Sequence, residues 1–219
     1  MIATSIRVAL TVGALASLAA CGNDRQEGTS ALGILGKAAT TVVAQQKAKN
    51  APKEPPPSPQ QMAAEALSVN KGPLILVNVE DTKMTQVLAM TGQNANMRTY
   101  MTKNEQALIF RNGMLSGTRG LGHDLSVADM NSSAALVLAG RSGTAERVMR
   151  YYSGDGLERP IPFTCTVGPG PKAGVMIESC EGHGISFQNN YIVSGGAVSV
   201  SRQWIGPGIG YITVQELRR

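Results

Sequence analysis

The sequence has few aromatic residues, few histidines and few charges. Of its 219 residues only 4% are aromatic, two are histidine and 16% are charged, with a formal net charge of +5. The basic residues are scattered along the chain, whereas phosphate binding needs a clustered basic face. The composition therefore argues against a nucleic-acid partner. An acidic polysaccharide or an anionic membrane surface stays compatible with it.

Motifs of metal, cofactor and catalytic chemistry are also missing. Two histidines and no Cys-x-x-Cys pair leave no zinc-type ligand set, and no Gly-x-Ser-x-Gly element marks a nucleophile. His123 is expected to be a turn residue. Acidic residues such as Glu80, Asp81, Glu178 and Glu181 leave a glycosidase open, but sequence spacing does not place two of them across one cleft. We therefore expect no metal, no cofactor and no enzyme.

No segment has the roughly 20 apolar residues of a membrane-spanning helix, but the N-terminus carries an export signal. Arg7 precedes a short apolar stretch, Val8 to Leu18. The stretch ends in Leu18-Ala19-Ala20-Cys21, which resembles the cleavage site of bacterial lipoproteins. We predict a signal peptide over residues 1–20 and an acylated Cys21 as the first mature residue. The alternative is an ordinary secretory signal with a chance cysteine.

Acylation would place the protein on a membrane without crossing it. Inner-membrane retention usually uses an Asp at the second mature position, whereas Asp24 is the fourth mature residue here. The sequence therefore favours the periplasmic face of the outer membrane.

Once Cys21 is acylated, Cys165 and Cys180 remain as an even pair in an oxidising compartment. The stretch Gly168-Pro169-Gly170-Pro171 between them indicates a turn that joins two strands. We predict a disulfide across the base of a hairpin. The rival interpretation, a metal or redox pair, lacks partner ligands.

Residues 21–57 have the composition of a disordered tether, with a weak helix and a proline-rich spacer. Ser58 before Pro59 then predicts a helix start, with Ser as the N-cap, and Gln60 to Leu67 continue the helix. The folded domain is expected to span residues 58–219.

The rest of the domain is expected to be mainly β. Short segments rich in β-branched residues alternate with glycine-rich turns, and Asn112-Gly113 is a strong hairpin signal. This pattern predicts an antiparallel β-sandwich or partly closed β-barrel with short N-terminal helices. Only residues 126–141 lack the strand pattern and suggest a short helix. The expected strands are 73–80, 85–91, 97–102, 106–111, 114–118, 145–152, 161–167, 174–180, 184–188, 191–194, 197–203 and 209–215.

Two sequence blocks resemble a known family. The first runs from Leu108-Ile109-Phe110-Arg111-Asn112-Gly113 to Gly120-Leu121-Gly122-His123-Asp124-Leu125, and the second includes Ser201-Arg202-Gln203-Trp204. Together they resemble the YjbF/GfcB lipoproteins, which are encoded with exopolysaccharide and group 4 capsule export genes. The resemblance covers roughly residues 60–218. It implies a β-rich periplasmic domain tethered to the outer membrane, and it transfers no catalytic residues.

Three side chains are candidate contacts for a saccharide or partner: Trp204, Arg202 and Arg111. Each has a structural alternative, a core aromatic for the tryptophan and ion pairs with neighbouring strands for the arginines. We expect a non-enzymatic accessory protein that interacts with outer-membrane or periplasmic polysaccharide-export proteins. The alternatives are a carbohydrate-binding module that contacts the polymer and, third, a polysaccharide hydrolase.

Overall fold

The computed structural model describes residues 55–219. The predicted signal peptide, Cys21 and most of the predicted tether lie outside these residues. Among the described residues, no helix is long and apolar enough to cross a membrane.

The described domain contains two helices and twelve strands, so the prediction of a mainly β fold is confirmed. The helices are α3 (Pro59–Val69) and α4 (Asn131–Leu138). The strands are β1 (Leu74–Val79), β2 (Met84–Asn94), β3 (Met97–Met101), β4 (Ala107–Arg111), β5 (Met114–Arg119), β6 (Leu125–Asp129), β7 (Gly143–Tyr152), β8 (Glu158–Pro169), β9 (Val175–Gly182), β10 (Ile185–Ser194), β11 (Ala197–Gly206) and β12 (Gly210–Arg218).

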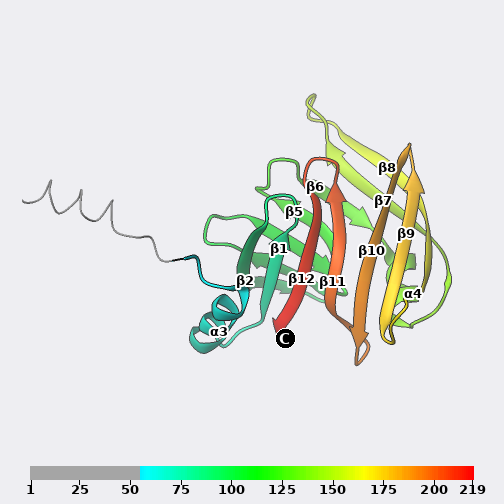
Figure 1. Ribbon diagram of the computed structural model, residues 1–219. Helices are drawn as coiled ribbons and strands as arrows, with labels where there is room; N and C mark the ends of the chain where they lie inside the picture. The colour runs from blue at the N-terminus through cyan, green and yellow to red at the C-terminus, as the bar shows by residue number, and fades with distance from the viewer. Residues whose placement is uncertain (1–54) are drawn as a thin grey trace, which may run out of the picture. The chain divides into compact units, whose positions relative to one another are not determined.

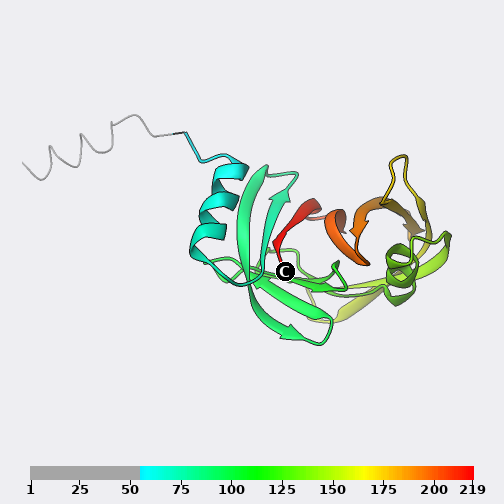
Figure 2. The ribbon, with the colours of Figure 1, turned by 90° about the horizontal axis from the view of Figure 1, so that it is seen from below.

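All strands belong to one antiparallel sheet that curls into a nearly closed barrel (Figures 1 and 2). The strand order is β5-β4-β3-β2-β1-β12-β11-β10-β9-β8-β7-β6. The two end strands, β5 and β6, lie against each other, and side chains join them. Thr118 Oγ1 accepts a hydrogen bond from the Leu125 amide at 2.9 Å. Arg119 Nη1 donates to the carbonyls of Leu125 and Ser126, both at 3.2 Å. Of the two predicted architectures, the structure is the partly closed barrel.

Local sequence signals set the ends of several elements. Ser58 caps α3 as predicted: its Oγ accepts from the Gln61 amide at 3.2 Å, and Gln61 Oε1 accepts from the Ser58 amide at 2.7 Å. Asn112 and Gly113 turn β4 into β5 with φ of 53° and 79°, the left-handed conformation that this dipeptide favours.

Two predictions of strand limits are wrong. The segment expected to lack strands contains most of β6 before the predicted short helix, which is α4. The strands expected over 184–188 and 191–194 are one strand, β10, which runs through Asn189 and Asn190. Asn189 is fully buried and hydrogen-bonded inside the domain, so it continues the strand instead of turning it.

The helices cover different parts of the sheet. Helix α3 packs on the outer side of β1, β2 and β12, and Figure 2 shows it beside the barrel. Helix α4 packs against β7 to β10. It buries Ser133, Ala134 and Val137. Ala134 and Val137 thereby join the hydrophobic core.

Candidate functional site

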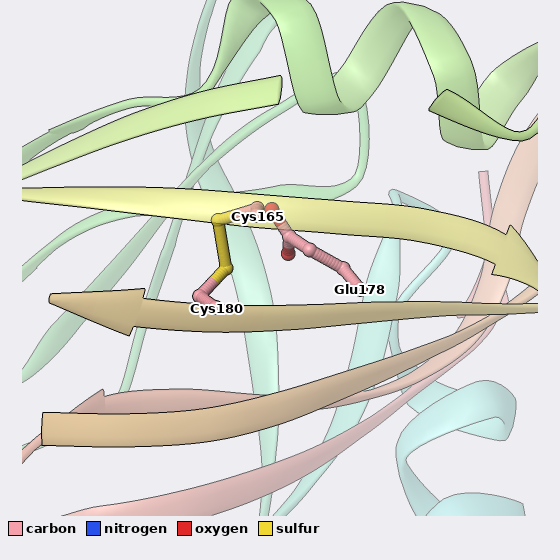
Figure 3. A group of neighbouring side chains, drawn as sticks. All are labelled: Cys165, Glu178 and Cys180. Carbon is pink, nitrogen blue, oxygen red and sulfur yellow. A yellow bond between two sulfur atoms is a disulfide. The ribbon is translucent and has the colours of Figure 1, made fainter. Parts of the chain in front are cut away.

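Cys165 on β8 and Cys180 on β9 are direct cross-strand partners and form the predicted disulfide, with Cα atoms 4.0 Å apart. Glu178 lies on the same face of β9, within 4.8 Å of both sulfur atoms (Figure 3). Sulfur atoms bonded to each other are not the thiolates that bind metals. The three side chains are therefore a structural group in the oxidised protein.

Glu178 is held in a buried ion pair with Arg147 of β7. The exposed fractions of the two side chains are 0% and 1%, and the two hydrogen bonds between them measure 3.2 and 3.0 Å. Asn189 Nδ2 and the Tyr191 hydroxyl both donate to Glu178 Oε2 at 2.8 Å. Burial alone would raise the pKa of Glu178, but the Arg147 charge and these hydrogen bonds outweigh burial and lower it. The carboxylate is thus charged and fully occupied by the protein.

The backbone pairing between β10 and β11 ends at the pair Asn190–Arg202. Trp204 lies beyond that pair, where the two strands separate. Asn189 Oδ1 accepts from the Trp204 amide at 2.8 Å. Trp204 is 8% exposed, and its indole stacks on Phe187 with ring centroids 4.5 Å apart. Trp204 therefore matches its structural alternative, a core aromatic.

Arg202 is held by its neighbours. Its guanidinium makes two hydrogen bonds to Glu80, at 2.8 and 2.7 Å, and lies 3.5 Å from the centre of the Tyr211 ring. The hydrogen bonds from Arg202 lower the pKa of Glu80. Arg202 therefore matches its structural alternative, an ion pair with a neighbouring strand.

Arg111, at the end of β4, is half-buried, and its Nε is buried without a hydrogen-bond partner among the described residues. Its contact with a saccharide or partner stays a prediction.

The two sequence blocks that carry the family resemblance meet inside the barrel. Gln203 Oε1 accepts from the Leu115 amide at 2.7 Å, and Gln203 Nε2 donates to the Gly113 carbonyl at 3.3 Å. A Cβ on Gly113 would lie 2.8 Å from Val198 Cβ, so only glycine allows this approach of the β4–β5 turn to β11. These contacts of Gln203 and Gly113 therefore hold the β4–β5 turn against β11.

A cavity of about 240 Å³ lies at one end of the barrel. The β2–β3, β4–β5 and β10–β11 turns surround it, together with the ends of β12 and α4. Its apolar wall is formed by Ile75, Phe110, Leu138, Val198 and Val214.

The cavity also holds charged and polar groups. Glu216 Oε2 lies 2.6 Å from Arg219 Nε, and Glu216 Oε1 lies 3.6 Å from Arg98 Nη1. Tyr100 lines the cavity and packs edge-on against Phe110, with ring centroids 6.0 Å apart. Burial raises the pKa of Tyr100, and Arg98 acts in the opposite direction. The arrangement offers hydrogen-bond donors and acceptors beside an apolar wall, as ligand cavities do.

Sequence reasoning missed Arg98, Tyr100, Glu216 and Arg219. Arg98 and Tyr100 alternate along a predicted strand, which indicated one shared face. Nothing local shows that this face meets the end of the chain more than a hundred residues later. That proximity follows from the strand order β3-β2-β1-β12 and from the curl of the sheet (Figure 2).

Comparisons with known proteins agree with the fold. Residues 36–217 match the family described as group 4 capsule polysaccharide lipoprotein gfcB, YjbF. Among solved structures, the domain resembles the crystal structure of the hypothetical lipoprotein YmcC from Escherichia coli (K12). The TM-score is 0.56 at 16% sequence identity, covering 89% of this chain and 98% of that chain. At this identity the likeness shows the fold alone. A search of the curated proteins finds no match to the chain.

Proposed function

Because the chain belongs to the YjbF family of group 4 capsule polysaccharide lipoproteins, we propose that it is a lipid-anchored accessory protein of exopolysaccharide production and export. It acts by protein interaction at the periplasmic face of the outer membrane and is anchored through Cys21. The observation that carries the proposal is the family match over most of the chain, combined with the lipoprotein-type cleavage site before Cys21.

A role in protein interaction is supported by the β7–β8 hairpin, whose tip extends past the neighbouring strands (Figure 1, yellow-green). The tip exposes 68% of Tyr152 and 60% of Leu157. Asp155 fixes its shape, because it accepts from the Leu157 amide at 3.0 Å and pairs with Arg159. An exposed aromatic residue on a rigid projection is a typical anchor for a protein partner.

The same hairpin is protected against pairing with another strand. Residues 158–163 of β8 pair with β7 only, because the ladder with β9 begins at Thr164. This free edge contains Pro160 and Pro162, which have no N–H to donate to an added strand. A partner would therefore bind through side chains at the tip.

A non-enzymatic role is supported by the state of two of the candidate carboxylates. Glu178 is buried in its ion pair with Arg147, and Glu80 is paired with Arg202. Neither is free to act as the acid or base of a glycosidase.

The experiment is a deletion strain complemented with the wild-type chain or with Cys21→Ser. Secreted and cell-retained polysaccharide are measured separately, after equal protein levels have been verified. We expect deletion to reduce secretion and the unanchored variant to fail to restore it. Unchanged polymer amounts on deletion would remove the export role. Full rescue by Cys21→Ser would remove the need for the anchor.

A second candidate function, direct binding of the polysaccharide, is favoured by the cavity at the end of the barrel.

A further inference from the structure

We propose that the cavity at the end of the barrel binds a carboxylate-bearing sugar unit of the exported polysaccharide, and that Arg98 pairs with its carboxylate. Only the identity of the polymer rests on the proposed function. The site itself is supported by the cavity, its apolar wall and its charges.

The cavity lining has the chemical groups that a sugar ring needs. A sugar ring has an apolar C–H face and a rim of hydroxyl groups. Phe110, Val198 and Val214 offer apolar surface for the face. Glu216 and the Tyr100 hydroxyl can accept and donate hydrogen bonds at the rim. At about 240 Å³ the cavity suits one or two sugar rings rather than a length of polymer.

The charges of the cavity favour an acidic sugar over a neutral one. Its lining side chains carry two guanidinium groups, Arg98 and Arg219, and one carboxylate, Glu216. Glu216 is close to Arg219, at 2.6 Å, but only distantly paired with Arg98, at 3.6 Å. A carboxylate ligand would pair with the planar guanidinium of Arg98 through two hydrogen bonds. A neutral sugar would leave the Arg98 guanidinium without a carboxylate partner.

The mouth of the cavity is formed before any ligand binds. The Asn112 amide donates to the Asn96 carbonyl at 3.0 Å, and Asn96 Nδ2 donates to Asn112 Oδ1 at 3.0 Å. These bonds join the β2–β3 and β4–β5 turns, while Gly113 packs against Val198 of β11. Binding would therefore require little ordering of the loops, which favours affinity.

The experiment uses the full chain purified in detergent, with binding measured by calorimetry. The probe is the polysaccharide secreted by the wild-type strain, cleaved to short oligosaccharides. Half of the preparation is treated so that its carboxyl groups are reduced to alcohols. The variants are Arg98→Gln and Arg98→Lys, and the control is Arg159→Gln at the tip of the β7–β8 hairpin.

We expect the untreated fragments to bind and the carboxyl-reduced fragments to bind at least tenfold more weakly. Arg98→Gln should weaken binding of the untreated fragments at least tenfold. Arg98→Lys, which keeps the charge but loses the planar guanidinium, should weaken it less, and Arg159→Gln should not change it. Arg98 is about one-third exposed, so these variants are expected to fold.

The proposal is overturned if the untreated fragments do not bind, if carboxyl reduction has no effect, or if Arg98→Gln binds like wild type. Such a result leaves the export role intact, because that role is decided by the deletion strain. Conversely, suppose that deletion causes no export defect while oligosaccharide binding still depends on Arg98. The binding site would then stand, and the role in export would be removed.

Discussion

At the scale of single residues, the buried pair Arg147–Glu178 is where a small change has a large effect. Glu178→Gln would leave Arg147 charged, buried and without a counter-ion, which costs about 3–5 kcal/mol. Urea unfolding followed by the fluorescence of Trp204, the single tryptophan, measures the loss. The matched control is Glu80→Gln, which breaks a half-exposed pair and should cost about 1 kcal/mol or less. Equal losses for the two variants would contradict the burial argument.

The same pair predicts how stability depends on pH. The folded-state pKa of Glu178 is lowered, so its charged form stabilises the fold above the unfolded-state pKa of about 4.3. This contribution is lost as pH falls through the lower folded-state pKa. The difference in unfolding free energy between wild type and Glu178→Gln should therefore narrow below about pH 4. Denaturant titrations at several pH values test this, and a difference that stays constant down to pH 3 would speak against it.

Residue roles were predictable from the sequence only where the cause is local. The Ser58 cap and the Asn112-Gly113 turn depend on neighbouring residues, and both were predicted. Trp204 and Gln203 depend on distant partners, Phe187 and Leu115, so the sequence could not decide between core and surface.

At the scale of elements, the disulfide ties β8 to β9. The sequence separation of its cysteines is 15, for which the loop-entropy model gives about 3 kcal/mol of stabilisation. Cys165→Ser combined with Cys180→Ser should lower the unfolding free energy by about that amount. Dithiothreitol should destabilise the wild type and leave the double variant unchanged. Two reactive thiols in the native exported protein would show that the disulfide is absent.

Element types were more predictable than element limits. Most strands were predicted because each lies between turn residues and carries β-branched or aromatic side chains. Strand β6 was missed because it is followed directly by α4, so its residues were grouped with the helix. Strand β10 was split because Asn189 and Asn190 are turn formers. Burial beside Glu178 overrides that preference for Asn189.

At the scale of the whole molecule, the sequence predicted a sandwich or a partly closed barrel and could not decide between them. A sandwich and a barrel use the same alternating strands, and they differ in whether the end strands meet. Here β5 and β6 meet through side-chain hydrogen bonds of Arg119 and Thr118. The order β3-β2-β1-β12 in the curled sheet brings Arg98 of β3 to Glu216 of β12. The candidate site is therefore a property of the topology rather than of any motif.

The closed barrel also separates two surfaces that experiments can test independently, the cavity and the tip of the β7–β8 hairpin. Tyr152→Ser combined with Leu157→Ser removes the exposed apolar side chains of the tip. Exposed substitutions usually change stability by less than about 0.5 kcal/mol each, so unfolding should be almost unaffected. If the tip anchors a partner protein, this variant should fail to restore secretion in the deletion strain, although it accumulates normally and binds oligosaccharide like wild type. Full restoration of secretion would rule out the tip as the interaction surface.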